Sequence, residues 1–378
     1  MIVVHFSDTH LGYSNFDNVN DEGINVREQD FYDAFEYVVD RILEIKPDIV
    51  IHSGDFFNKP SPTNRAMTFA LEQLKRISIA KIPFVVIAGN HSTPKTIYTS
   101  PILKAFRTIE GVYPIFNQQY EWVEFENVVV HGLPHINDLQ VQNEEIGKIQ
   151  IYPNKKNILM LHTSLGKNYL MDEYGEQLFP EDWIDLLKQF DYVALGHWHN
   201  FQQVTILDNA WYSGSTERMS DTEISHDKGY CILDFSNKDR LVPNFVKIPT
   251  RNWYKLEIQQ CFEKETDDII AEIMNFIQAN DVEDSIFNLN FHDIKSEQSL
   301  ELSNSKIKEF FPSVFSLNIK RKSYQEKSFF HQIESGSFDK LNEILTAFIR
   351  SKYNQSNQVE ALVEKANFYF NQYEQITP

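Results

Sequence analysis

The chain has 378 residues and carries 35 Lys and Arg against 54 Asp and Glu, which gives a formal net charge of −19. That length supports one large hydrophobic core with smaller modules beside it. The sequence lacks the run of roughly 18 apolar residues that a membrane span needs, and the acidic charge disfavours general attraction to nucleic acid without removing a local binding site.

The N-terminus enters a strand-like run at once, without the basic leader of a signal peptide. This start predicts a cytosolic protein, and in that compartment Cys231 and Cys261 are expected to be unpaired thiols. His5 and His52 lie inside strand-like runs and are predicted to be packing residues.

Residues 1–250 alternate strand-like and helix-like segments. The apolar strand runs cover residues 2–7, 48–53, 83–88, 157–161 and 191–195. Apolar residues at helical spacing predict helices around 31–42 and 67–77, and Ser100-Pro101 predicts the start of another over 101–110. The later strands, with less helix between them, are predicted at 123–133, 201–207, 209–215 and 229–235. This order predicts a two-sheet α/β sandwich rather than a single doubly wound sheet.

The pattern changes near residue 251. Strands at 253–258, 285–291 and 314–320, with helices at 266–279 and 305–311, predict a small α/β domain over 251–322. Residues 323–337 are predicted to be a linker. Two amphipathic helices over 338–353 and 358–373 then predict a helical hairpin in the tail, residues 338–378.

Residues of the types that bind metals follow each of the five apolar strand runs. They are Asp8, His10, Asp55, Asn90, His162, His197 and His199. Open α/β folds place their sites at the carboxyl ends of strands, where such side chains meet. Carboxylate, amide oxygen and imidazole suit a hard or borderline divalent metal.

Seven candidate ligands exceed the three or four of a mononuclear site and predict two metal ions that share Asp55. One ion is expected on Asp8, His10, Asp55 and His199. The other is expected on Asp55, Asn90, His162 and His197.

The order of these motifs resembles the calcineurin-like metallophosphoesterase superfamily over about residues 1–235. The matching motifs are Asp8-Thr9-His10, Gly54-Asp55, Gly89-Asn90-His91, His162 and Gly196-His197-Trp198-His199. Their flanks are similar to the SbcD and meiotic-recombination-eleven nuclease family, in the segments Ser7 to Gly12, Gly54 to Phe57 before Pro60-Ser61, and Gly214 to Arg218.

The resemblance implies a nuclease subunit of an SbcCD-like DNA repair complex. It would hydrolyse DNA with two divalent ions, usually manganese, as a 3′–5′ exonuclease and endonuclease on double-strand ends and hairpins. The domain at 251–322 would be the capping domain that helps recognise DNA, and the tail would dock on an SbcC-type coiled-coil ATPase. A homodimer is expected through residues 63–78 and 98–110.

The resemblance also implies that His91 is the catalytic residue, as the general acid or transition-state stabiliser near the scissile phosphate. Two positions depart from the common pattern of the family. Ser92 stands where an acidic residue is common, and Asn58 where many members carry a second histidine. These departures bear on the rate of cleavage rather than on metal binding.

Two other functions stay open at this point. One is a metallophosphoesterase that acts on a small or protein-bound phosphate ester, although a capping domain and a tail would be superfluous for such a substrate. The other is a non-catalytic scaffold for an ATPase, against which the complete ligand set and His91 weigh.

Overall fold

The computed structural model describes residues 1–94, 99–166, 169, 178–236, 241–324, 341–352 and 359–374. The chain forms two compact units. The first contains Met1–Leu256, Ile277–Leu289 and Phe311–Asn318, and the second contains Glu257–Phe276, Asn290–Phe310 and Ile319–Pro378. The predicted limits after residues 250, 322 and 337 stay predictions.

The first sheet of the larger unit has six strands in the order β12-β11-β1-β2-β3-β4. These strands are β12 (Asn244–Lys247), β11 (Gly229–Asp234), β1 (Ile2–Phe6), β2 (Ile49–His52), β3 (Phe84–Ile87) and β4 (Val112–Ile115). Strands β1 to β4 run parallel, whereas β11 pairs antiparallel with both β1 and β12.

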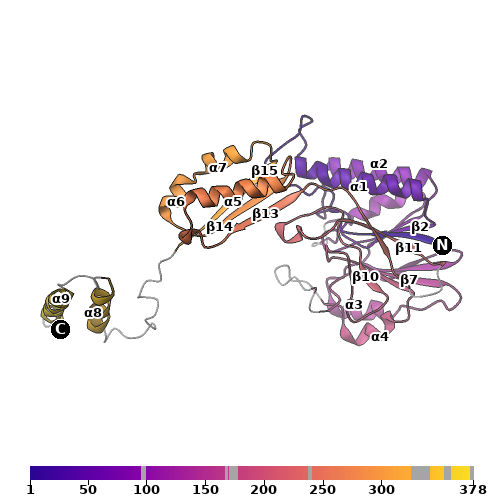
Figure 1. Ribbon diagram of the computed structural model, residues 1–378. Helices are drawn as coiled ribbons and strands as arrows, with labels where there is room; N and C mark the ends of the chain where they lie inside the picture. The colour runs from indigo at the N-terminus through magenta and orange to yellow at the C-terminus, as the bar shows by residue number, and fades with distance from the viewer. Residues whose placement is uncertain are drawn as a thin grey trace. The chain divides into compact units, whose positions relative to one another are not determined.

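Two long helices, α1 (Val26–Ile45) and α2 (Asn64–Ile79), lie together on one side of this sheet (Figure 1). Asn25 caps α1 by accepting hydrogen bonds from two backbone N–H groups, and Thr63 caps α2. The apolar faces of both helices pack on β1 to β4 in one buried cluster.

The segment predicted as a helix over 101–110 is instead the 3-10 helix η1 (Ile102–Thr108). Pro101 occupies its cap position and provides no side-chain hydrogen bond. With seven residues, η1 is longer than the roughly three or four residues that are usual for a 3-10 helix.

The second sheet has the order β5-β6-β7-β8-β10-β9. Its strands are β5 (Glu121–Glu124), β6 (Val128–Leu133), β7 (Lys156–His162), β8 (Tyr192–Gly196), β10 (Ala210–Tyr212) and β9 (Gln202–Gln203). The single strand predicted at 123–133 is wrong: it is an antiparallel hairpin, because the chain turns between Glu124 and Val128. Helices α3 (Leu139–Ile146) and α4 (Ile184–Leu187), with η4 (Glu181–Trp183), belong to this half (Figure 1).

The two sheets pack face to face, as the sequence predicts. Their inner faces form one buried apolar cluster that includes Val3, Ile51 and Val85 from the first sheet and Val130 and Met160 from the second. Alternation along each strand directs these side chains inward. The α/β sandwich of the prediction is therefore confirmed.

A third sheet has the order β13-β14-β15. It is formed by β13 (Trp253–Ile258), β14 (Ile286–Ile294) and β15 (Ser316–Ser323), and the helical segments of this region are η6 (Cys261–Glu263), α5 (Thr266–Ala279), α6 (Ser296–Glu301) and α7 (Asn304–Phe310). The predicted alternation of strand and helix after residue 251 is present, with α6 as an additional helix.

The tail contains α8 (Leu341–Lys352) and α9 (Val359–Glu374). Arg350 and Glu360 form an ion pair between them at 2.9 Å, and Thr346 donates a hydrogen bond to Asn367. Residues 325–340, which hold most of the predicted linker and the start of the first tail helix, lie outside the described residues. None of the helices in the described segments is long and apolar enough to cross a bilayer.

Candidate metal centre

The seven predicted ligands follow the carboxyl ends of parallel strands from both sheets. Asp8 and His10 follow β1, Asp55 follows β2 and Asn90 follows β3 in the first sheet. In the second sheet, His162 is the last residue of β7, while His197 and His199 follow β8. Residues up to 191 positions apart in the sequence are thereby brought to one edge of the sandwich.

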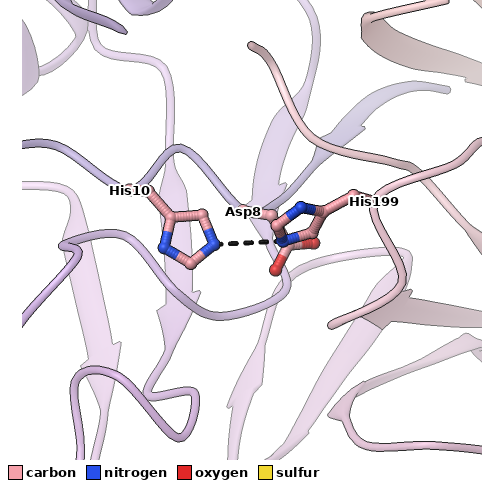
Figure 2. Close-up of side chains that lie close together, drawn as sticks. All are labelled: Asp8, His10 and His199. Carbon is pink, nitrogen blue, oxygen red and sulfur yellow. Dashed lines mark hydrogen bonds between the residues drawn. The ribbon is translucent and has the colours of Figure 1, made fainter. Parts of the chain in front are cut away.

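Within the described part of the chain, three groups of side chains place one ligand atom each within 4.8 Å of one another. The groups are Asp8, His10 and His199; His10, Asp55 and His91; and Asp8, Asp55 and His162. The first group contains three of the four ligands predicted for one ion (Figure 2). The third group adds Asp8 beside Asp55 and His162, so both aspartates lie close to more than one histidine.

Asn90 and His197 lie beside His162. The Oδ1 atom of Asn90 is 2.9 Å from Nε2 of His162, and the His197 ring centre is 5.4 Å from that of His162. The predicted assignment of ligands to two ions stays a prediction.

The donor atoms fit a divalent cation. Nε2 of His10 and Nε2 of His199 face each other at 3.2 Å (Figure 2), and Nδ1 of His10 is buried and has no hydrogen-bond partner among the residues that the structure describes. Nε2 of His162 lies 3.1 Å from Oδ2 of Asp55. Imidazole nitrogens and carboxylate oxygens that converge in a buried space match the ligand chemistry of borderline metals.

The groups behind the ligands fix their orientation. The backbone carbonyl of Ser53 accepts a hydrogen bond from Nδ1 of His162 at 2.8 Å, and Oε1 of Glu223 lies 3.1 Å from Nδ1 of His199. In both rings the Nε2 atom is left to face the site. Neither of these two residues has a signal in the sequence, because Ser53 simply precedes the Gly-Asp motif and Glu223 lies 24 positions after His199.

Backbone N–H groups hold the two aspartates. The N–H of His197 donates to both carboxylate oxygens of Asp8, at 3.1 and 3.0 Å, and the N–H of His91 donates to Oδ1 of Asp55 at 2.9 Å. The turn after each strand therefore orients a ligand that another strand contributes.

Charge and burial oppose each other at this site. Burial alone would raise the pKa of Asp55 and lower that of His162, but their mutual attraction reverses both shifts. The pKa of Asp55 falls well below its usual value, and that of His162 rises to about 9. Burial keeps the pKa of His10 well below its usual value, so this ring is a neutral donor at pH 7.

The ligands sit on unusual backbone. Asp8, His10, Asp55 and His197 all have positive φ, at 53°, 41°, 51° and 100°. Residues other than glycine rarely adopt this region, and such strain concentrates at functional sites. The sharp turns direct four ligands toward the same space.

Two motif glycines are required by close approach. A Cβ atom on Gly89 would lie 2.3 Å from Oδ1 of Asp55, and one on Gly196 would lie 2.1 Å from the carbonyl oxygen of Ser53. Both distances are far shorter than any real contact, so a larger residue at either position would displace a ligand or its holder.

His91 lies at the edge of the site and is partly exposed. Its Nδ1 is 2.9 Å from the backbone carbonyl of Asn58, and its ring packs edge-on against His10 with centres 4.9 Å apart. The contact to residue 58 uses the main chain, so the asparagine side chain at this position does not remove it. Ser92 is buried.

The two strand histidines are structural, as predicted. His5 contacts the Tyr192 hydroxyl and Ser53, while His52 contacts Thr9. Burial lowers the pKa of each to about 3, which keeps both rings neutral. Both Cys231 and Cys261 are buried and free.

A family model described as calcineurin-like phosphoesterase matches residues 1–201. A DNA double-strand break repair protein Mre11 from Sulfolobus acidocaldarius is 33% identical over 269 residues, which cover 68% of this chain and 66% of that protein. The Mre11 of Methanocaldococcus jannaschii is 33% identical over 261 residues, with 66% of each chain covered. The alignments thus span just under two thirds of these relatives. The Mre11 of Methanococcus maripaludis is 29% identical over 347 residues, 82% of this chain and 89% of that protein.

Proposed function

This chain belongs to the calcineurin-like phosphoesterase family, and from that membership we propose that it is a metal-dependent DNA nuclease. The convergence of Asp8, Asp55 and His162 within 4.8 Å carries the phosphodiesterase part of the proposal. Similarity to proteins named for DNA double-strand break repair supports DNA as the substrate.

The chain's own residues would hold two divalent cations, with Mn²⁺ as the expected metal. When bound, such ions stabilise charge on the phosphoryl oxygens and lower the pKa of water so that it attacks as hydroxide. Asp8, His10, Asp55 and His199 would hold one ion. The other would be held by Asp55, Asn90, His162 and His197.

His91 would transfer the proton at the scissile bond. The Asn58 carbonyl accepts a hydrogen bond from Nδ1, so Nε2 holds a proton only when the ring is the doubly protonated imidazolium. In that form His91 would give the Nε2 proton to the leaving 3′ oxygen and return to the neutral ring. The partial exposure of this ring fits a group that must meet a large substrate.

We also propose specific activities and partners. The activities would be 3′–5′ exonuclease and endonuclease cleavage at double-strand ends and hairpins, with residues 251–322 helping to recognise DNA. The tail would bind an SbcC-type coiled-coil ATPase, and two copies would associate through 63–78 and 98–110.

Burial weighs against part of the predicted dimer surface. Leu103 and Phe106, which motivated it, are fully buried in the core of their own chain. Ile79 is 72% exposed but lies one residue beyond the predicted segment 63–78. A monomer mass by light scattering at micromolar concentration would count against the dimer.

The decisive experiment compares substrates. Labelled duplex and hairpin DNA are incubated with the full chain, with and without Mn²⁺ and with and without the ATPase, beside a nitrophenyl phosphate ester. We expect metal-dependent cleavage of DNA. Hydrolysis of the small ester alone would favour the phosphoesterase alternative, and inactivity on both substrates with Mn²⁺ would favour the scaffold.

A further inference from the structure

A carboxylate outside the predicted ligand set contacts His199. Glu223, the last residue of η5 (Asp221–Glu223), places Oε1 3.1 Å from Nδ1 of this histidine. An ionised carboxylate only accepts hydrogen bonds, so Nδ1 carries the hydrogen. In the neutral ring the lone pair then lies on Nε2, the atom that faces His10 at 3.2 Å (Figure 2).

A buried lysine fixes Glu223 in turn. Lys228 is 1% exposed, and its Nζ donates to Oε2 of Glu223 at 2.5 Å, to the backbone carbonyl of His199 at 2.8 Å and to Oγ of Ser215 at 2.8 Å. An ammonium group has three hydrogens, and these contacts use all of them. Both the ring and the main chain of His199 are therefore held by this pair.

A buried ion pair is weak evidence for stability alone, because desolvation offsets most of the attraction between its charges. The pair does more than pack, because it fixes the tautomer and the orientation of the His199 imidazole. We infer that Glu223 and Lys228 are positioning residues that hold His199 toward a divalent cation bound with Asp8 and His10. The inference rests on the proposed metal-dependent function.

The pair serves only part of the centre. His162 is held differently, because its Nδ1 contacts the backbone carbonyl of Ser53 at 2.8 Å. A substitution at Glu223 removes a charged holder from His199 and leaves the holder of His162 in place. The two predicted ions should therefore respond unequally to it.

Calorimetric titration of the metal-free full chain with Mn²⁺ tests this directly. We expect Glu223→Gln to weaken one of two binding events by about 10- to 100-fold, the usual effect of losing such a partner, and to leave the other event unchanged. Equal affinities in the variant and the wild type would overturn the inference.

Two further variants separate positioning from folding. Glu223→Gln combined with Lys228→Met removes both buried charges, so it should recover thermal stability without recovering the weakened affinity. Asp227 is an exposed carboxylate four residues after Glu223, and it forms an ion pair with Lys247 of β12. Asp227→Asn removes the same charge as Glu223→Gln and should bind Mn²⁺ as the wild type does. Recovery of affinity in the double variant, or equal weakening in Asp227→Asn, would contradict a positioning role.

Nitrogen-15 spectra of the imidazole rings provide a readout that needs no metal. The spectra are recorded at a pH at which His199 is neutral, and its signals are assigned by comparison with His199→Gln. They should show Nδ1 protonated in the wild type and a mixture of tautomers in Glu223→Gln. An unchanged tautomer would overturn the inference. Fewer than two Mn²⁺ ions on the wild type would instead count against the proposed function, and the spectra would still decide the role of Glu223.

Discussion

Asp55 is the residue at which the contacts of the centre meet. Its carboxylate lies near His162 and His10 and accepts a hydrogen bond from the backbone N–H of His91. Asp55→Asn keeps the shape but replaces a charged ligand by a weaker neutral one, so we expect at least about a tenfold loss of Mn²⁺ affinity at both ions. Calorimetry measures this, with Asp48→Asn at the amino end of β2 as the matched control. Loss of a single ion would argue against a shared ligand.

A substitution at His91 tests catalysis separately from the binding of metal and DNA. His91→Ala keeps the backbone N–H that holds Asp55 and removes only the imidazole. We expect both metals and DNA affinity to persist while cleavage slows by about 100-fold or more, as for loss of an acid catalyst. Single-turnover kinetics on duplex DNA beside a metal titration check it. If one ion is lost with the ring, His91 is a ligand, as its closeness to His10 and Asp55 allows.

At the scale of elements, β6 carries a buried histidine that couples folding to pH. His131 is fully buried between Tyr120 and Asn157, and burial lowers its pKa to about 4. The unfolded chain takes up this proton near pH 6.5, before the folded chain does. The free energy of unfolding should therefore fall between pH 6.5 and 4, by up to about 3 kcal/mol from this group.

Urea unfolding of the wild type and of His131→Gln at several pH values isolates this contribution. Both proteins keep His5 and His52, so the difference between their pH profiles belongs to His131 alone. The variant should show the flatter profile below pH 6.5. Parallel profiles would mean that His131 is not held neutral in the folded protein.

At the scale of the whole molecule, the tail is expected to be separable from catalysis. On α9, Leu362, Phe368 and Tyr369 are 41%, 59% and 59% exposed, an apolar surface of the kind that binds partner helices. We expect deletion of 335–378 to leave metal-dependent phosphodiesterase activity intact and to abolish assembly with an SbcC-type ATPase and ATP-stimulated cleavage. Copurification with the ATPase measures assembly.

Point variants refine the deletion. Leu362→Ser, Phe368→Ser and Tyr369→Ser together should reproduce the loss of assembly. The control variant Glu364→Gln with Lys365→Gln, at two other exposed positions of α9, should not. Full-stoichiometry copurification of the truncated chain would exclude the tail as the docking element.

The sequence by itself determined the sandwich and the candidate ligands, because both depend on local signals. An apolar run followed by Asp8 or Asp55 marks the carboxyl end of a buried strand, and parallel strands bring such ends to one edge. Local signals also placed His5 and His52 correctly as packing residues.

Only the tertiary structure decided which of these residues meet and what holds them. Loops distant in sequence bring Glu223 and Lys228 against His199, and no periodicity or spacing marks them. The turn that divides 123–133 into two strands and the tight form of η1 were likewise missed, because a run of apolar residues does not define where the chain reverses. Side-chain direction, burial and hydrogen-bond partners arise from packing between segments, which a linear pattern does not contain.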